Sequence, residues 1–519
     1  MSRVRLGDAL DRLPPGAASL TRALLEVADA EGVSVLLVGG PVRDLLLGRA
    51  LVDVDLLVDA PDPHAAGELA ERLASETIRC VRHDRFGTAS LEGAEAGLDL
   101  ATVRSETYAY PGALPSVAPG DLDSDLARRD FSVNALALPL SAAARAAHPE
   151  IVDRLGGLDD LGARRLRVLH ARSFHDDPTR ALRAARLGPR LGFHLARGSR
   201  SALRDALREG ATGRVSGDRL RREFVRVFED ARRGLQPNQA LRALDDWHVL
   251  GALEPGLVLD KRSVLPLRRL GRATAEPPWA VARWRPWLSG LGLWLGPLSV
   301  SLRRRALKRL GVRGAPAQRV QNLWRDAERA ARALARARGR GRIDALLGGL
   351  DEEELVGVWS LADPTLRRRV VRYAQEDRQR RPPVGGADLV AAGLSGSEVG
   401  RALERIRVAW LDGALGTRDE AITLGLEVAR RRRRKAGKGP RAAKSAKVAQ
   451  PAKKSAKAVA GSKAPTSAKA VTGSKAPTSA KATPSAKAAK PARAAAAARP
   501  AKAKKAASPA KPGKDSRTG

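Results

Sequence analysis

The stretch Leu36–Asp59, LLVGGPVRDLLLGRALVDVDLLVD, decides the fold of the first part of the chain. An apolar, β-branched run from Val33 to Val38 stops at the pair Gly39 and Gly40, and proline and a leucine-rich segment follow. Such a run favours a buried strand, paired glycines favour a tight turn, and proline is common at the first helical position. The pattern predicts strand, turn and helix, with a turn whose backbone a phosphate chain can approach.

The segment Val52–Val58 is predicted to be the next strand, with Val52, Val54, Leu56 and Val58 facing a core. Residues two apart in a strand point to the same face, so Asp53 and Asp55 should project together. Adjacent carboxylates repel each other, and a hard cation such as Mg²⁺ relieves that repulsion. A polar strand end with two solvated aspartates is the alternative.

The composition indicates a soluble protein of two or more domains, because 43% of the 519 residues are apolar. No apolar run approaches the roughly 20 residues that cross a membrane. The N-terminus has no apolar core of a signal peptide. Cys80 is the only cysteine, which excludes a disulfide within the chain and agrees with a cytoplasmic location.

The formal net charge of +37 indicates a polyanionic partner. Residues 431–519 carry 26 Lys and Arg against Asp515 alone, a net charge of +25, which leaves +12 for residues 1–430. The same segment is low in complexity and repeats GSKAPTSAKA at 461–470 and 473–482. It has too few large apolar residues to form a core, so we expect it to be disordered.

Two further motifs combine charges at spacings that suit a nucleotide. Arg128 and Arg129 can neutralise a triphosphate, and Asp130 and Asn134, one helical turn apart, should share a face that meets a ribose. A loop rich in proline, glycine and serine, residues 108–124, precedes them and is expected to be mobile and to close over a site.

Asp177 and Arg180 lie three apart in a predicted helix and should share a face. A carboxylate that accepts from an amine, beside a guanidinium that donates to a ring nitrogen, fits both cytosine and adenine. Uracil and guanine place a carbonyl where the amine should be, and the unpaired groups would reject them. The alternative is that Asp177 caps the helix and Arg180 lies on the surface.

Three of these segments together resemble one family: GGPVRDLLLG followed by DVD, RRDFSVNAL, and DDPTRALRAARLGPRLGF. They are similar to the motifs of the class II tRNA CCA-adding nucleotidyltransferases and bacterial poly(A) polymerases, over about residues 33–421. The chain departs from the usual pattern at Ser132, Asp176 and Asp218, where the family usually has threonine, glutamate and glutamate.

The resemblance implies the activity, the cofactor and the partners. It implies a template-independent enzyme that adds C and A from CTP and ATP to the 3′ end of tRNA, with Mg²⁺ as cofactor and no membrane partner. It implies that Asp53, Asp55 and Asp99 are the catalytic carboxylates and metal ligands. The implied nucleotide-binding residues are Gly39, Gly40, Arg43, Asp44, Arg128, Arg129, Asp130, Asn134, Asp177 and Arg180.

The expected fold class is α+β. We expect a nucleotidyltransferase head with a small mixed sheet over residues 1–150, nucleobase-template and neck helices over 151–235, a helical RNA-binding body and tail over 236–430, and a disordered basic extension over 431–519. Two other products remain open: poly(A), or A alone or CC. A catalytically idle RNA-binding protein is the remaining alternative.

Overall fold

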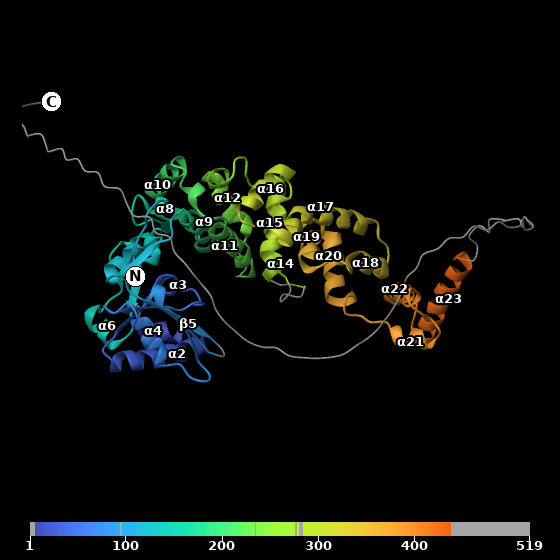
Figure 1. The fold of residues 1–519 in the computed structure, drawn as a ribbon, viewed down its shortest axis with the longest axis horizontal. Coiled ribbons are helices and arrows are strands. Elements are labelled where there is room, and N and C mark those ends of the chain that lie inside the picture. The colour runs from blue at the N-terminus through green and yellow to red at the C-terminus, as the bar shows by residue number, and fades with distance from the viewer. Residues whose placement is uncertain (1–5, 94–95, 234, 276–277, 280–283, 437–519) are drawn as a thin grey trace, which may run out of the picture. The chain divides into compact units, whose positions relative to one another are not determined.

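A seven-stranded mixed sheet forms the head (Figure 1). Its strands lie in the order β3 (Arg79–His83), β4 (Thr88–Glu92), β5 (Gly97–Thr102), β2 (Asp55–Asp59), β1 (Ser34–Val38), β8 (Leu136–Pro139) and β9 (Val152–Asp153). The pair of β2 and β5 is parallel and the other neighbouring pairs are antiparallel. Because β9 continues this sheet, the head extends past the predicted boundary at residue 150.

The structure is a computed structural model that describes residues 6–93, 96–233, 235–275, 278–279 and 284–436. It confirms the predicted α+β class, with a mixed sheet first and a mostly helical remainder. The predicted disorder of the basic extension lies outside the described residues, except at its start. There α23 (Arg418–Ala436) continues as a helix beyond residue 431.

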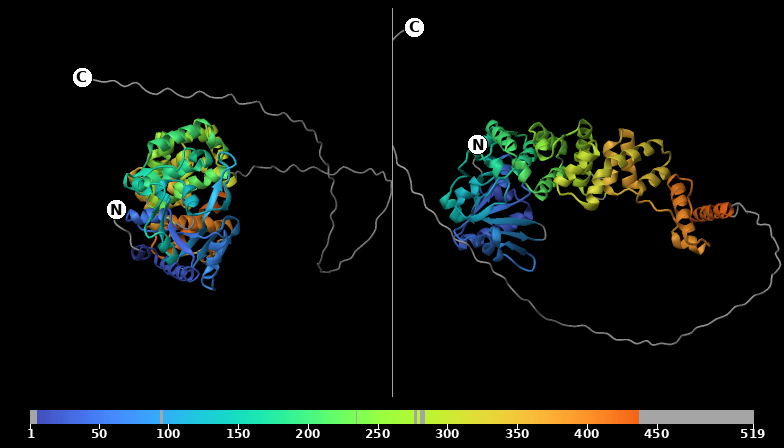
Figure 2. Two further views of the ribbon diagram at one scale, coloured as in Figure 1. Left: turned by 90° about the vertical axis from the view of Figure 1, so that its left-hand side faces the viewer. Right: turned by 45° about the horizontal axis from the view of Figure 1, so that its top comes forward.

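Helices cover both faces of the head sheet (Figures 1 and 2). One face buries Val35, Leu37, Leu56 and Val58 against the helices near the N-terminus, and the other buries Leu36, Val38 and Leu57 against the helix before Arg128. This alternation follows from the period of two in a strand. The head helices are α1 (Leu6–Asp11), α2 (Pro15–Ala30), α3 (Gly40–Leu46), α4 (Ala65–Glu71), α5 (Leu122–Ala127) and α6 (Ala142–Ala147).

The predicted strand Val52–Val58 begins later than expected, at Asp55. The strand β1 pairs with β2 only over Ser34–Leu37, because the chain then turns at Gly39, so residues 52 and 53 have no strand partner on that side. Val52 is exposed, whereas Val54 is buried. Asp53 therefore precedes the strand, although its charge still acts on Asp55.

The predicted mobile loop 108–124 is partly regular. It contains β7 (Ser116–Pro119), which pairs with β6 (Arg104–Thr107) in a small antiparallel sheet, and the start of α5. The amide of Gly112 donates to the carbonyls of His175 and Asp176, and Arg219 donates to the carbonyl of Gly112 at 2.8 Å. These bonds fix the loop against the helices that follow.

The region from the head to Ala374 shares one large apolar cluster, which crosses the predicted boundary at residue 235. A two-stranded parallel sheet, β10 (Arg165–Leu166) and β11 (His194–Leu195), lies within it. Its helices are α7 (Gly157–Gly162), α8 (Ser173–Asp176), α9 (Thr179–Leu191), α10 (Arg197–Arg208), α11 (Gly217–Glu229), α12 (Pro237–Asp246), α13 (Val249–Leu253), α14 (Lys261–Ala275), α15 (Pro286–Leu295), α16 (Val300–Arg309), α17 (Gly314–Arg336), α18 (Arg340–Leu347), α19 (Glu352–Leu361) and α20 (Pro364–Arg372).

The last described helices have an apolar core of their own. This core joins α21 (Gly386–Ala391), α22 (Ser397–Leu411) and α23, and it includes Leu389, Ile406 and Ala421. The contact with the preceding helices combines two hydrogen bonds of 2.6 Å, from Arg407 of α22 to Asp344 of α18, with close packing of Gly341 of α18 against the backbone of Val408. The helices α21–α23 thus have a separate core and contact the preceding helices through an ion pair and close packing.

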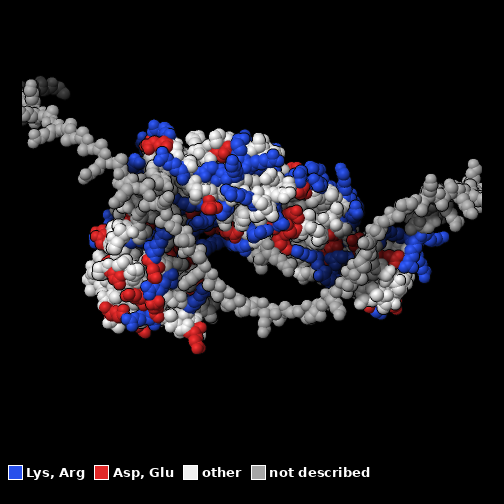
Figure 3. All heavy atoms as spheres, in the orientation of Figure 1, with Lys and Arg blue, Asp and Glu red and all other residues white. Residues whose placement is uncertain are grey.

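Positive side chains on the helical part are almost all arginine. Lys and Arg side chains are spread over its visible face, and both signs of charge occur on the head (Figure 3). Among residues 1–430, lysine occurs only at 261 and 308. No helix within the described ranges is long and apolar enough to cross a membrane.

We expect Gly290→Ala to lower the free energy of unfolding by about 1–3 kcal/mol, because it would overpack a core. A Cβ at this buried position of α15 would lie 2.2 Å from Phe228 Cδ1. The matched control is Gly198→Ala in α10, where nothing lies within 4 Å and a gain of about 0.4–1 kcal/mol is expected. Denaturant unfolding of both variants measures the difference, and equal effects would contradict the packing around Phe228.

Candidate active site

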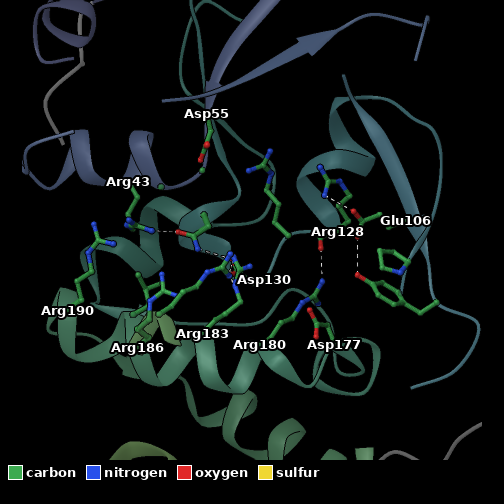
Figure 4. Close-up of a pocket in the computed structure, with 18 residues that line it drawn as sticks. Arg43, Asp55, Glu106, Arg128, Asp130, Asp177, Arg180, Arg183, Arg186 and Arg190 are labelled. Carbon is green, nitrogen blue, oxygen red and sulfur yellow. Dashed lines mark hydrogen bonds and ion pairs between the residues drawn. The ribbon is translucent and has the colours of Figure 1, made fainter. Parts of the chain in front are cut away.

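A cavity of about 660 Å³ opens where the head meets α9 and α11. Arg43 and Asp55 reach it from the head, and Arg180, Arg183 and Arg186 reach it from α9 (Figure 4). It is lined by Gly39, Gly40, Arg43, Asp55, Glu106, Tyr108, Pro115, Arg128, Arg129, Asp130, Asn134, Asp177, Arg180, Arg183, Arg186, Leu187, Arg190 and Arg226. Eight arginines against four carboxylates make it strongly positive, as a polyanionic ligand requires.

Two of the predicted carboxylates face each other across the parallel strands. Asp55 of β2 stands in register with Asp99 of β5, and Asp99 accepts a 2.7 Å hydrogen bond from Ser90 of β4. Asp53 is mostly exposed before the strand, with one oxygen 3.9 Å from Arg233. The strand pairing thus brings Asp55 and Asp99 together, and the preceding segment supplies Asp53.

Asp55 is the electrostatically unfavourable member of this group. Burial raises its pKa, and the charges of Asp99 and Asp53 raise it further, against the opposing effect of Arg129 and Arg43. A carboxylate with a raised pKa beside other carboxylates is common at catalytic sites, where a cation or substrate compensates.

The glycine turn leaves room for an arginine. Gly39 has a φ of 76°, and a Cβ there would lie 2.9 Å from Arg129 Nη1, so a larger residue would meet both backbone strain and a clash. From α3, the buried Arg43 donates to Asp44 at 2.8 and 2.9 Å and also to Asn134. Burial lowers the pKa of Arg43, and Asp44 opposes that effect. Asp44 therefore lies behind the cavity and holds Arg43.

Buried Asp125 holds both arginines of the pair 128 and 129. It forms ion pairs with each of them, at 2.8 Å to Arg129, while Arg128 also donates to Glu106 at 2.9 Å. Glu106 in turn accepts from the hydroxyl of Tyr108 at 3.0 Å. Burial and the charge of Glu106 raise the pKa of Tyr108 to about 12, so the hydroxyl is protonated near neutral pH.

Asp130 and Asn134 lie side by side, although not through the predicted helical turn. A short 3-10 helix spans only Ser132–Asn134, and the side-chain amide of Asn134 donates to the carboxylate of Asp130 at 2.9 Å. Arg183 of α9 forms a 2.8 Å ion pair with Asp130. Burial opposes ionisation of Asp130, but Arg183, Asn134 and Arg180 outweigh it and lower its pKa.

Asp177 and Arg180 both line the cavity, but Asp177 lies before α9, not within it. Its Oδ1 accepts from the amide of Thr179 at 3.0 Å, as the capping alternative requires, and from Arg219 at 2.7 Å. Arg180 is buried and donates to Ser173 and, at 2.7 Å, to the carbonyl of Arg128. Both side chains are therefore held in place, and Arg180 is not a surface residue.

Most of the predicted residues meet at this cavity, but sequence reasoning missed others. Asp99 lies at a smaller cavity beside it, which Asp55 and Arg129 also line. The missed arginines of α9 repeat every three or four residues after Arg180, which is a signal for one helical face. The missed lining residues that carry charge or a hydroxyl are Glu106, Tyr108, Arg183, Arg186, Arg190 and Arg226.

The predicted metal site is not closed by protein ligands alone. Across the described ranges, no group of three or more His, Cys, Asp or Glu side chains is arranged to hold a metal ion. The facing pair of Asp55 and Asp99 nevertheless fits Mg²⁺, which proteins commonly hold with one or two carboxylates plus substrate phosphates. The ligand set of Asp53, Asp55 and Asp99 stays a prediction.

Comparisons with known proteins agree with this geometry. Residues 35–167 match the poly A polymerase head domain. An A-adding tRNA nucleotidyltransferase of Geobacter sulfurreducens is 31% identical over 437 residues, which cover 80% of this chain and 48% of that protein. A CC-adding tRNA nucleotidyltransferase of Deinococcus radiodurans is 42% identical over 226 residues, which cover 43% of this chain and 56% of that protein. The chain thus spans about half the length of these curated relatives.

A solved structure is similar over most of the described chain. The CCA-adding enzyme of Thermotoga maritima, complexed with tRNA, aligns with a TM-score of 0.61 and 26% identity, over 83% of this chain and all of that one. Sheet, carboxylate pair and arginine-lined cavity define a nucleotidyltransferase head of the poly A polymerase type. The chain therefore carries a poly A polymerase head domain over residues 35–167, and over much of its length it is similar to tRNA nucleotidyltransferases named A-adding, CC-adding and CCA-adding.

We expect Asp55→Asn to raise the free energy of unfolding at pH 7. The pKa of Asp55 is raised in the folded protein, so ionisation of this carboxyl group at pH 7 destabilises the folded state relative to the unfolded chain. As pH falls through that pKa, Asp55 becomes neutral like asparagine, so the gain should shrink and vanish below about 3.9, the unfolded value. Denaturant unfolding across a pH series measures this.

The control for that series is Glu76→Gln, which neutralises an exposed acid of the head and should leave stability unchanged. An Asp55→Asn protein that is less stable than the unaltered chain at pH 7 would contradict the assigned electrostatics.

Proposed function

We propose that this chain is a template-independent RNA nucleotidyltransferase that adds CCA to the 3′ end of tRNA, using CTP and ATP. One observation carries the proposal: a single cavity joins the carboxylate Asp55, a row of arginines and the pair Asp177 and Arg180. The relatives named A-adding, CC-adding and CCA-adding support nucleotide addition to tRNA 3′ ends.

The cavity orients a nucleoside triphosphate in one direction. The base lies against Asp177 and Arg180, and the ribose lies by Asp130 and Asn134, which are fixed by Arg183 and Arg43. The triphosphate then extends towards Gly39 and Gly40, and the cations that would bind it are Arg43, Arg129, Arg186 and Arg190, which line the same cavity. Guanidinium groups suit this task because they bind phosphate oxygens in pairs and stay charged.

Base selection rests on side chains whose positions are set before the nucleotide arrives. Arg219 and the Thr179 amide hold Asp177, while Ser173 and the Arg128 carbonyl hold Arg180. The remaining oxygen of Asp177 accepts from the exocyclic amine, and the remaining N–H groups of Arg180 donate to the ring nitrogen. Cytosine and adenine satisfy both, whereas uracil and guanine leave Asp177 facing a carbonyl.

The reaction is an in-line displacement at the α-phosphorus. The 3′-oxygen of the RNA forms a bond to this phosphorus, the bond to the bridging oxygen breaks, and pyrophosphate leaves with its charge on the arginine row. Asp99, which is exposed and held by Ser90, accepts the proton of the 3′-hydroxyl. Asp55 and Asp99, with Asp53 beside them, would hold Mg²⁺, which when bound neutralises phosphate charge and polarises the reacting oxygens.

In this proposal the rest of the chain positions the base and binds the RNA. The template and neck helices 151–235 position the base, the helical body and tail 236–430 bind tRNA, and the basic extension 431–519 adds affinity for nucleic acid. A reaction on tRNA with CTP and ATP belongs in the cytoplasm. CCA addition is favoured over poly(A) because the strand start at Arg85-Phe86-Gly87-Thr88 lacks the arginine run of poly(A) polymerases and resembles CCA-adding relatives.

The deciding test incubates the full chain with tRNA lacking its 3′ end, with CTP, ATP or both, and sequences the products. We expect C residues with CTP alone and CCA with both. A single A added only after a CC end would identify an A-adding enzyme, and arrest after CC would identify a CC-adding one. Long ATP-only tails on unstructured RNA, with CTP ignored, would make the poly(A) alternative correct.

We expect Arg180→Ala to lower kcat/KM for CTP and ATP by about 10- to 100-fold, because a charge-assisted hydrogen bond of roughly 1.5–3 kcal/mol is lost. The kcat/KM for UTP and GTP should fall by a smaller factor, so the enzyme should discriminate less between these triphosphates and CTP or ATP. Single-turnover addition with each triphosphate measures this, with Arg204→Ala, an exposed arginine of α10, as the control. Equal slowing with all four triphosphates would show that Arg180 binds phosphate or backbone and not the base.

A further inference from the structure

A second cavity, of about 320 Å³, adjoins the first along the face of the head sheet. Asp55 and Arg129 line both cavities and form the wall between them. The second cavity extends from this wall over β5 and β4, where Asp99, Ser90 and Thr88 line it. The nucleotide-binding residues of the first cavity leave this second space unexplained.

The floor of the second cavity is set by strand register. Ser90 stands opposite Asp99, and Thr88 stands opposite Ala101, so all four lie on the same face of the sheet. Ser90 already donates to Asp99. Thr88 is half-buried, and among the described residues its hydroxyl has no hydrogen-bond partner, so it is available to a ligand.

The composition of the second cavity suits a different ligand from that of the first. It has one arginine and two carboxylates where the first has eight arginines, so it does not attract a triphosphate. Its volume lies at the lower end of the roughly 300–1,000 Å³ of ligand pockets, which fits one nucleoside. Its free polar group is a hydroxyl, which can pair with a sugar hydroxyl.

The geometry of the reaction places the 3′ end of the acceptor RNA on the side of Asp55 where the second cavity lies. In phosphoryl transfer the attacking and leaving oxygens stand on opposite sides of the phosphorus. If the triphosphate extends from Asp55 into the first cavity, the 3′-hydroxyl must approach from the other side of Asp55. The second cavity occupies that side.

We propose that the second cavity holds the 3′-terminal nucleoside of the acceptor RNA and that the Thr88 hydroxyl bonds to its 2′-hydroxyl. This inference rests on the proposed function. The 2′-hydroxyl is the group that distinguishes RNA from DNA at a given site, so Thr88 makes the enzyme selective for a ribose terminus.

The test compares acceptor tRNAs that end in ribose or in 2′-deoxyribose, each with its 3′-hydroxyl intact. For Thr88→Val, which keeps the shape and removes the hydroxyl, the ratio of kcat/KM for the two acceptors should fall by about 3- to 10-fold, the worth of one neutral hydrogen bond. Thr88→Ser should restore the ratio of the unaltered chain. Thr107→Val, at an exposed position of β6, is the matched control and should leave it unchanged.

A second variant tests the cavity independently of the hydroxyl. Ala101→Met fills the space and should raise the KM for tRNA about 10-fold or more, while equilibrium binding of CTP and ATP stays unchanged. Ala118→Met, exposed on β7, is its control. An unchanged acceptor ratio in Thr88→Val overturns the role of Thr88, and an unchanged KM in Ala101→Met overturns the acceptor site. An unaltered chain that extends no RNA would instead overturn the proposed function.

Discussion

Ion pairs with buried carboxylates hold the arginine-lined cavity together. Eight guanidinium groups around one space repel one another, and all of them except Arg180 form ion pairs with acidic side chains. Asp125 holds Arg128 and Arg129, Asp130 holds Arg183, and Asp44 holds Arg43 and Arg190. The carboxylates compensate part of the charge of these arginines, whereas neutral groups, Ser173 and the carbonyl of Arg128, hold Arg180. Breaking one such pair leaves a buried charge without a partner, which is more costly than losing an exposed pair.

Local motifs revealed the head and most of its cavity, because each motif lies on one short segment. The glycine turn and Asp55 could be recognised from neighbouring residues. The strand start was predicted too early, at Val52 instead of Asp55, because β1 ends at the glycine turn and gives residues 52 and 53 no strand partner. The hydrogen bond from Arg219 to Asp177 spans 42 residues, and such contacts leave no periodic signal. The two residues of β9 were missed at the head boundary because so short a strand has no pattern.

The helical part contains two separate apolar cores. One apolar cluster runs from the helices beside the head to Ala374, so α9 and the helices that follow it share a core. The helices α21–α23 have a core of their own and are joined to this cluster by the ion pair of Arg407 and Asp344 and by packing of Gly341 against Val408. Because this ion pair is mostly buried, salt screens it less than it screens exposed pairs. The proposed base-selecting residues Asp177 and Arg180 lie beside the large cluster, away from the helices α21–α23.

The near-absence of lysine from residues 1–430 determines how the protein can be chemically labelled. Every cation that lines the main cavity is a guanidinium, which stays protonated at any pH used for biochemistry. Reagents that acylate amines would therefore find only Lys261 and Lys308 among the side chains of residues 1–430, both exposed on the helical part, and then the many lysines of the extension. The cavity would keep its charge through an amine cross-linking or fluorophore-coupling reaction, while the extension would lose most of its own.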